Sequence, residues 1–90
     1  FLPEEIKLYP SYPNPFNPKT TISVSIANAA LIKLNIYDVN GRLVDNLYDS
    51  VIAPGHYQLA WHATNKASGI YFVLLESAGQ IKTQKLVLMK

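Results

Sequence analysis

The chain has 90 residues, of which 49% are hydrophobic and 16% are charged, and its formal net charge is +2. This length allows one small core, and the composition excludes intrinsic disorder and a long solvent-exposed helix or coiled coil. Eight basic residues are scattered among six acidic ones, so the sequence lacks the basic block that nucleic-acid binding would need.

The sequence contains no cysteine, which excludes disulfides and thiolate metal sites. Its longest apolar run, residues 70–75, is far shorter than the about 20 residues that a membrane-spanning helix needs. No charged stretch followed by an apolar one marks a signal peptide. Because the chain begins with Phe1 rather than Met, we expect a fragment cut from the end of a longer protein.

Residues 12–18 read Tyr-Pro-Asn-Pro-Phe-Asn-Pro, with three prolines among seven residues. Each proline fixes φ, removes a backbone donor and biases the preceding residue away from helix. The segment therefore cannot be a central strand. We expect Asn14 and Asn17 to hydrogen-bond nearby backbone, and Tyr12 and Phe16 to anchor the segment.

Alternating apolar and polar residues predict half-buried strands along most of the chain. The apolar faces of the first two clear strands are expected to consist of Ile22, Val24, Ile26, Ile32, Leu34 and Ile36. Residues 40–41 are Asn-Gly, a pair that tolerates the positive φ angles of a tight turn, so they predict a hairpin. Residues 49–54 are expected to form a loop, which the Pro-Gly pair at residues 54–55 closes.

The second half of the chain continues with the same period of two. Residues 70–75 are apolar on both faces and predict a central strand, residues 78–80 predict a turn, and residues 81–89 predict the last strand. The polar positions of that last strand are Lys82, Lys85 and Lys90. The aromatic residues expected in the core are Tyr57, Trp61, Tyr71 and Phe72.

Seven candidate strands, counting one near Ile6, and the lack of a sustained helical period predict an all-β chain. Many short strands with regular turn signals are typical of an immunoglobulin-like β-sandwich of about seven antiparallel strands; a barrel is the less favoured alternative. We predict a single domain, with residues 1–19 as a proline-rich lead-in packed on the sandwich and residues 20–90 as the sandwich itself.

The residues that could support catalysis or metal binding are few. His56 and His62 are the only histidines, and on one strand they would lie roughly 20 Å apart, too far to share a metal ion. The stretch from Asp38 resembles a calcium loop only superficially, because Gly41 occupies the fourth rather than the sixth position. The sequence therefore predicts no enzyme, and it implies no cofactor and no metal site.

Six motifs follow one another in the order YPNPFNP, TTISVSI, IYDVNGRLV, GHYQLAW, SGIYFVLL and TQKLVLMK. From about Tyr9 to Lys90, this series resembles the type A C-terminal sorting domain of the type IX secretion system, and it is similar to immunoglobulin-like domains of the flagellar hook-cap type. The positions that match the family motifs are Pro13, Asn14, Pro15, Phe16, Asn17, Pro18, Asp38, Gly41, Arg42, Gly55, Trp61, Gly69 and Tyr71.

The resemblance implies a non-catalytic address label at the C-terminus of a secreted protein. It implies recognition by an outer-membrane translocon, passage of the N-terminal cargo through the periplasm, and cell-surface attachment or release after a sortase-like peptidase acts. It implies neither a nucleic-acid partner nor a membrane-spanning segment.

We hypothesise that the last strand carries translocon recognition, through strand addition at its edge. The residues of this hypothesis are Lys82, Lys85, Leu86, Val87, Leu88 and Lys90. Lysines on an edge strand also discourage aggregation, which is their more common role. The alternative function is a non-catalytic accessory module, carbohydrate-binding or spacer, of a secreted hydrolase.

Overall fold

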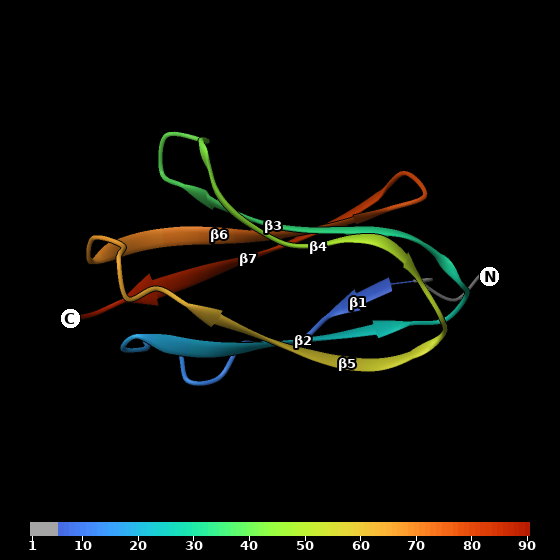
Figure 1. The fold of residues 1–90 in the computed structure, drawn as a ribbon, viewed down its shortest axis with the longest axis horizontal. Helices are drawn as coiled ribbons and strands as arrows, with labels where there is room; N and C mark the ends of the chain where they lie inside the picture. Colours follow the sequence, from blue (N-terminus) through green and yellow to red (C-terminus); the bar gives the residue numbers. More distant parts are fainter. Residues whose placement is uncertain (1–5) are drawn as a thin grey trace.

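The computed structural model describes residues 6–90, which form two β-sheets packed face to face (Figure 1). Residues 1–5, with which the predicted lead-in begins, lie outside the described residues. One sheet has three strands in the order β1 (Ile6–Leu8), β2 (Lys19–Ile26) and β5 (Gly55–His62). The other has four strands in the order β4 (Leu43–Ile52), β3 (Ala30–Asp38), β6 (Gly69–Ser77) and β7 (Gln80–Leu88).

Every strand pairing within the two sheets is antiparallel. The structure therefore confirms the predicted all-β sandwich of seven antiparallel strands. β6 lies between β3 and β7, which confirms residues 70–75 as part of a central strand.

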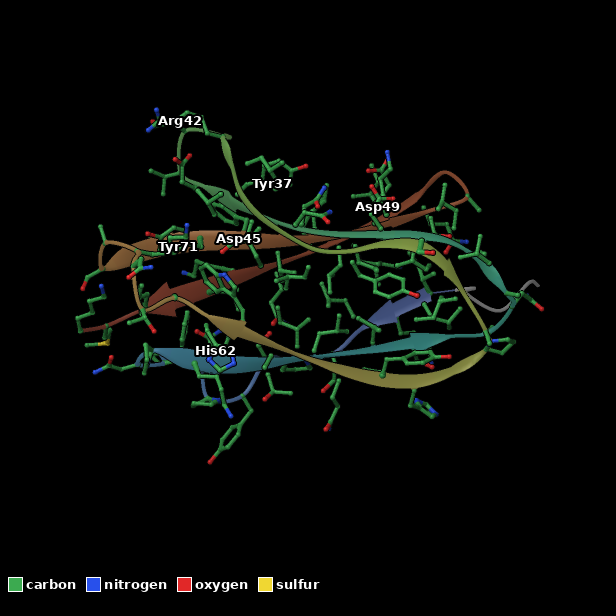
Figure 2. All side chains as sticks on the ribbon, viewed as in Figure 1. Tyr37, Arg42, Asp45, Asp49, His62 and Tyr71 are labelled. Atoms are coloured by element: carbon green, nitrogen blue, oxygen red, sulfur yellow. The ribbon has the colours of Figure 1, made fainter. Side chains whose placement is uncertain are left out.

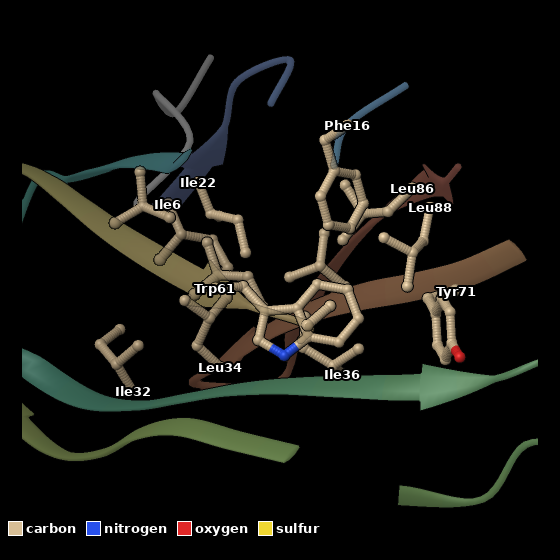
Figure 3. Close-up of a cluster of buried hydrophobic side chains, with 14 of the residues drawn as sticks. Ile6, Phe16, Ile22, Ile32, Leu34, Ile36, Trp61, Tyr71, Leu86 and Leu88 are labelled. Atoms are coloured by element: carbon tan, nitrogen blue, oxygen red, sulfur yellow. The ribbon is translucent and has the colours of Figure 1, made fainter. Parts of the chain in front are cut away.

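The core lies between the sheets and is built from the apolar faces that the alternation predicts (Figure 3). In β2 and β3 the buried side chains are Ile22, Val24, Ile26, Ile32, Leu34 and Ile36. A fully buried aliphatic side chain contributes about 1.5–3 kcal/mol relative to an exposed one. Because the side-chain period of a strand is two, a one-residue shift in register would move each of these side chains to the solvent face.

The predicted hairpin between β3 and β4 is present. Gly41 has a φ of 79°, a conformation that glycine adopts without steric cost. The carboxylate of Asp38 accepts hydrogen bonds from the backbone N–H groups of Asn40 (2.9 Å) and Arg42 (3.0 Å). The turn predicted at residues 78–80 lies between β6 and β7 but is limited to residues 78–79, because Gln80 already belongs to β7.

The prediction of a loop over residues 49–54 is wrong. β4 continues to Ile52, whose backbone pairs with that of Ala30 at the start of β3. The polar residues in this stretch suggested a loop. However, residues 49–52 pair with residues 30–33 of β3, which supply their backbone hydrogen-bond partners. Only residues 53–54 remain to connect β4 with β5.

The expectation of a buried Phe72 is also wrong, because its side chain is 38% exposed. Phe72 alternates with Tyr71 and Val73, which point into the core, and so it faces away from the sandwich. The structure confirms Trp61 and Tyr71 as core residues, and Tyr57 packs against the core while half-buried.

Candidate recognition surface

Residues 9–18, which we call the strap, connect the two sheets. On the three-stranded side, the backbone of Tyr12 exchanges two hydrogen bonds with that of Thr21, at 3.1 and 2.9 Å. The hydroxyl of Thr20 donates to the carbonyl oxygen of Pro13 at 2.7 Å. The strap is therefore held against β2 although its prolines exclude it from a regular ladder.

The prediction that the Tyr12 side chain anchors this segment is wrong, since it is 81% exposed. Only the backbone of Tyr12 takes part in the attachment, so its ring points into solvent. The end of the strap is fixed separately, because the carbonyl oxygen of Pro18 accepts a hydrogen bond of 2.8 Å from the backbone N–H of Ala63.

On the four-stranded side, Asn14 binds the outer edge of β7. Its Nδ2 donates to the carbonyl oxygen of Lys85 at 2.9 Å, and its Oδ1 accepts from the backbone N–H of Val87 at 3.0 Å. We predicted that Asn14 bonds nearby backbone, but its partners lie 71 and 73 residues away along the chain. One side-chain amide thus occupies the donor and acceptor that a neighbouring strand would use.

Phe16 continues this attachment with both its backbone and its ring (Figure 3). Its N–H donates to the carbonyl oxygen of Val87, and its carbonyl oxygen accepts from the N–H of Met89, each at 3.0 Å. The ring is only 3% exposed and lies 5.5 Å, centroid to centroid, from Trp61, which in turn lies 5.2 Å from Tyr71. The structure thus places Phe16 as the anchor that the sequence predicts.

Gln84 is a third link between the strap and β7, and the sequence analysis missed it. Its Oε1 accepts from the backbone N–H and the hydroxyl of Ser11, at 2.7 and 2.6 Å, and its Nε2 donates to the carbonyl oxygen of Tyr9 at 3.0 Å. A signal was available, because Gln84 is a polar residue on the same strand face as Leu86 and Leu88. A polar side chain in such a row requires a hydrogen-bond partner.

These contacts change the interpretation of the last strand. β7 is an edge strand of its sheet, as the hypothesis of strand addition requires. However, its outer edge from Lys85 to Met89 is already occupied by the strap. A partner strand could pair with this stretch only after the strap had left it.

The three lysines of the hypothesis do not form one charged row. Lys85 is exposed on the outer face of the sheet, opposite Phe72. Lys82 is half-buried on the opposite face of β7. Lys90 follows the strand, and its Nζ donates to the carbonyl oxygen of Thr64 at 2.9 Å. Lys85 is therefore the lysine best placed to meet a partner.

The apolar residues of the hypothesis divide in the same way. Leu86 and Leu88 are 0% and 1% exposed, so in the folded domain they contact the core and not a partner. Val87 is half-buried and lies on the outer face with Lys85.

Three further family positions, Asp38, Gly41 and Arg42, lie at the turn between β3 and β4. Figure 2 shows Arg42 at the tip of this hairpin. Nε of Arg42 forms an ion pair of 3.3 Å with Oδ2 of Asp38, while 77% of the Arg42 side chain stays exposed. The hydrogen bond from the backbone N–H of Arg42 is the main reason that the pKa of Asp38 lies below its usual value. Together with Gly41, these residues fix the shape of the turn.

The remaining family positions also shape the sandwich. Gly55 and Gly69 begin β5 and β6, each with a φ of 151° that other residues rarely adopt. The indole Nε1 of Trp61 donates to Oδ2 of Asp45 at 2.7 Å, which satisfies the polar atom of a buried ring. Of the family positions, only Phe16, Trp61 and Tyr71 are buried. Most of the others are exposed, in the strap and at the turns that begin or join strands.

The two histidines lie on one strand, as the sequence predicts: His56 and His62 are both exposed on β5. Figure 2 labels His62. Among residues 6–90, no group of three or more His, Asp or Glu side chains is placed to hold a metal ion. The same residues contain no helix with the length and apolar character needed to cross a bilayer.

A family model described as the secretion system C-terminal sorting domain matches residues 11–89. The match begins within the strap and ends one residue beyond β7, so it includes the bonds that Ser11, Asn14 and Phe16 make with β7. The chain belongs to this family. No curated protein matches it.

The sorting domain is a C-terminal signal for type IX secretion, and the family is not a catalytic one. It directs export across the outer membrane to the cell surface or the extracellular space. The match supports the sorting interpretation over that of an accessory module.

Proposed function

We propose that the export machinery reads this sorting domain in its folded form, on the outward side chains of β7 and on the strap bound along its edge. The observation that carries the proposal is the pair of hydrogen bonds between Asn14 and the backbone of β7. The strap and β7 come from opposite ends of the chain, so only the folded domain presents them together. A receptor that binds both the strap and β7 would therefore accept only chains whose sorting domain has folded.

Within β7, the residues divide between contact and support. Lys85 and Val87 contact the receptor, because both lie on the outer face. In the described part of the chain, Lys85 forms no ion pair, which leaves its charge for a carboxylate of the partner. Leu86 and Leu88 hold the strand in place, while Lys82 and Lys90 flank the contact.

Recognition of side chains replaces the strand addition that the sequence suggests. Strand addition uses a free edge, and the strap occupies the edge of β7 beside Val87. A receptor that binds the outer face does not have to break these hydrogen bonds first.

The proposal involves three partners: the N-terminal cargo, the outer-membrane translocon and a sortase-like peptidase. The N-terminal cargo crosses the periplasm with the folded domain attached, and the outer-membrane translocon binds the domain. A sortase-like peptidase then separates domain and cargo, after which the cargo is attached to the cell surface or released.

A test fuses residues 1–90 to a fluorescent cargo in a host with a type IX system, with and without its translocon. We expect Lys85→Glu to lower the extracellular fraction about tenfold, as the loss of one charged interface contact does. Lys90→Glu is expected to have a smaller effect, since Lys90 also bonds within the domain.

The matched control is Lys7→Glu, which makes the same charge change at an exposed position of β1. Thermal unfolding of each purified variant checks that the fold is intact. If Lys85→Glu is exported as well as Lys7→Glu, β7 does not carry recognition.

A further inference from the structure

The outer face of the four-stranded sheet carries an exposed cluster of apolar side chains. We call this cluster the apolar patch; its residues are Tyr37, Leu43, Ile70, Phe72 and Val87. Leu43, Ile70 and Phe72 are 56%, 41% and 38% exposed, and the other two are half-buried. None of the five belongs to the buried core.

The strand register brings these side chains together. Tyr37 lies opposite Leu43 on one side and Phe72 on the other, and Ile70 lies opposite Val87. Directly opposed side chains on one face have Cβ atoms about 4.5–5.5 Å apart, so they form one surface rather than scattered exposed residues. Single exposed hydrophobic residues are common, but a contiguous patch marks an interaction site.

Cationic side chains border this patch. Lys85 lies opposite Phe72 on β7, and Arg42 precedes Leu43 at the hairpin tip. Figure 2 shows Arg42 and Tyr37 on the outer side of the sheet, away from the three-stranded sheet. Of the nearby acids, Asp38 is already paired with Arg42.

The other end of the same face also carries exposed apolar side chains (Leu31, Val51 and Ile81), but its charge differs. There Lys33 on β3 lies between two acids, with Asp49 opposite it on β4 and Glu76 opposite it on β6. The outer face therefore has apolar side chains at both ends, with Lys85 beside the apolar patch and two acids around Lys33 at the other end. A partner that meets the apolar patch is favoured when it offers negative charge to Lys85.

We propose that the apolar patch, with Lys85 and Arg42 at its border, docks on a protein of the export machinery whose apolar surface is edged by carboxylates. This inference rests on the proposed function and extends the contact from β7 onto β6 and the hairpin. Continuity supports it, because Val87 and Lys85 belong to β7 and adjoin the patch.

A distinct partner fits better than a second copy of this chain. Two copies that met through this patch would bring their Lys85 side chains, which lack an ion pair within the described residues, toward one another. Like charges that face each other across an interface oppose association. An acidic partner instead removes the apolar side chains from water and neutralises Lys85, which forms no ion pair within residues 6–90.

The test uses the same cargo fusion with two substitutions on different strands, Phe72→Thr and Leu43→Ser. Each is expected to lower the extracellular fraction about tenfold, which is the effect of losing a modest interface contact. The control is Ile81→Thr, which removes an apolar side chain that is 57% exposed at the other end of the same face. Thermal unfolding checks each purified variant for an intact fold.

Export that falls for both patch variants, but not for Ile81→Thr, supports the inference. Export of the patch variants at the control level overturns it, and if Lys85→Glu still blocks export, the proposed function survives. An equal loss in all three variants also overturns it, because the effect is then not specific to the patch. A wild-type dimer in sedimentation that Phe72→Thr converts to a monomer assigns the patch to a second copy and overturns the choice of partner.

Discussion

At the scale of single residues, the side chain of Asn14 gives β7 the two hydrogen bonds that a neighbouring peptide group would give. Removing one partner of a hydrogen bond leaves the other group to be solvated or orphaned, with a net effect of about 0.5–1.5 kcal/mol per bond. Asn14→Ala, which removes both bonds, should therefore lower the free energy of unfolding by about 1–3 kcal/mol. Urea denaturation followed by the fluorescence of Trp61, the single tryptophan, measures this change.

The matched control for this prediction is Asn17→Ala, in the same segment. Asn17 is exposed, and within the described residues its side chain forms no hydrogen bond. Exposed substitutions of this kind usually change stability by less than about 0.5 kcal/mol. Equal effects of the two substitutions would show that Asn14 does not hold the edge of β7.

Asp38 gives a prediction about pH. Backbone N–H groups and the Arg42 guanidinium favour its charged form, so its folded-state pKa lies below the usual 3.8. A depressed carboxyl pKa adds stability above the unfolded-state pKa, and that stability is lost as the pH falls through the folded-state value. The contribution should be complete at neutral pH, begin to decrease near pH 3.8 and disappear only below the lower, folded-state pKa.

A titration of the Asp38 carboxyl carbon by nuclear magnetic resonance measures this pKa directly. Arg42→Gln removes the guanidinium but keeps the backbone N–H, so the pKa should rise while staying below 3.8. A wild-type midpoint at or above 3.8 would contradict the hydrogen-bond geometry of the hairpin.

At the scale of elements, the strap depends on one buried ring. Phe16 packs on Trp61 and is 3% exposed. Truncating a buried Phe to Ala removes its transfer free energy and leaves a cavity, at about 3–5 kcal/mol. We expect Phe16→Ala to destabilise the domain by this amount and to shift the emission of Trp61, which loses an aromatic neighbour.

Tyr12→Ala is the control for Phe16→Ala, because Tyr12 is an aromatic residue of the same strap with an exposed side chain. Its substitution should change the free energy of unfolding by less than about 0.5 kcal/mol. A large effect of Tyr12→Ala in urea denaturation would restore the predicted anchor and contradict the structure.

The contrast between Tyr12 and Phe16 shows how far sequence reasoning extends. Alternation predicted the buried faces of β2 and β3, because a strand's period of two is a local property. Whether an aromatic ring in a proline-rich segment points inward depends on what lies beside it. The same holds for Phe72. Because β6 is apolar on both of its faces, the sequence alone does not show which face packs on the core.

The candidate site was harder to predict for the same reason. The sequence indicated the strap and the last strand separately, and both belong to the candidate recognition surface. Their attachment depends on Asn14 and Gln84, whose partners lie more than seventy residues away. No local pattern encodes such a contact. The one local signal was that Gln84 is a polar residue on the same face of β7 as Leu86 and Leu88, where it needs a hydrogen-bond partner.

At the scale of the whole molecule, the strap joins both sheets and both ends of the described chain. It bonds β2 through Thr21 and β7 through Val87, so it closes one side of the sandwich. Loss of β7 should therefore release the strap as well. The proposed signal for export and the stability of the fold would then depend on the same contacts.

Deletion of residues 85–90 tests this dependence. It removes Leu86 and Leu88, each fully buried, and the hydrogen bonds that hold Asn14 and Phe16. The loss of a buried leucine costs about 2–5 kcal/mol, and a small domain has only about 5–15 kcal/mol in total. We expect the truncated chain to be unfolded at 25 °C, with a red-shifted emission of Trp61 and a far-ultraviolet dichroism spectrum without β-structure.

Deletion of residues 89–90 alone is the matched control. Both side chains are exposed, and the truncation removes the hydrogen bond from Met89 to Phe16 but leaves Leu86 and Leu88 in the core. This shorter deletion should therefore lower stability while preserving the fold and its cooperative unfolding. If the chain without residues 85–90 still unfolds cooperatively with buried Trp61 fluorescence, the sandwich closes without β7, and strap and strand do not depend on one another.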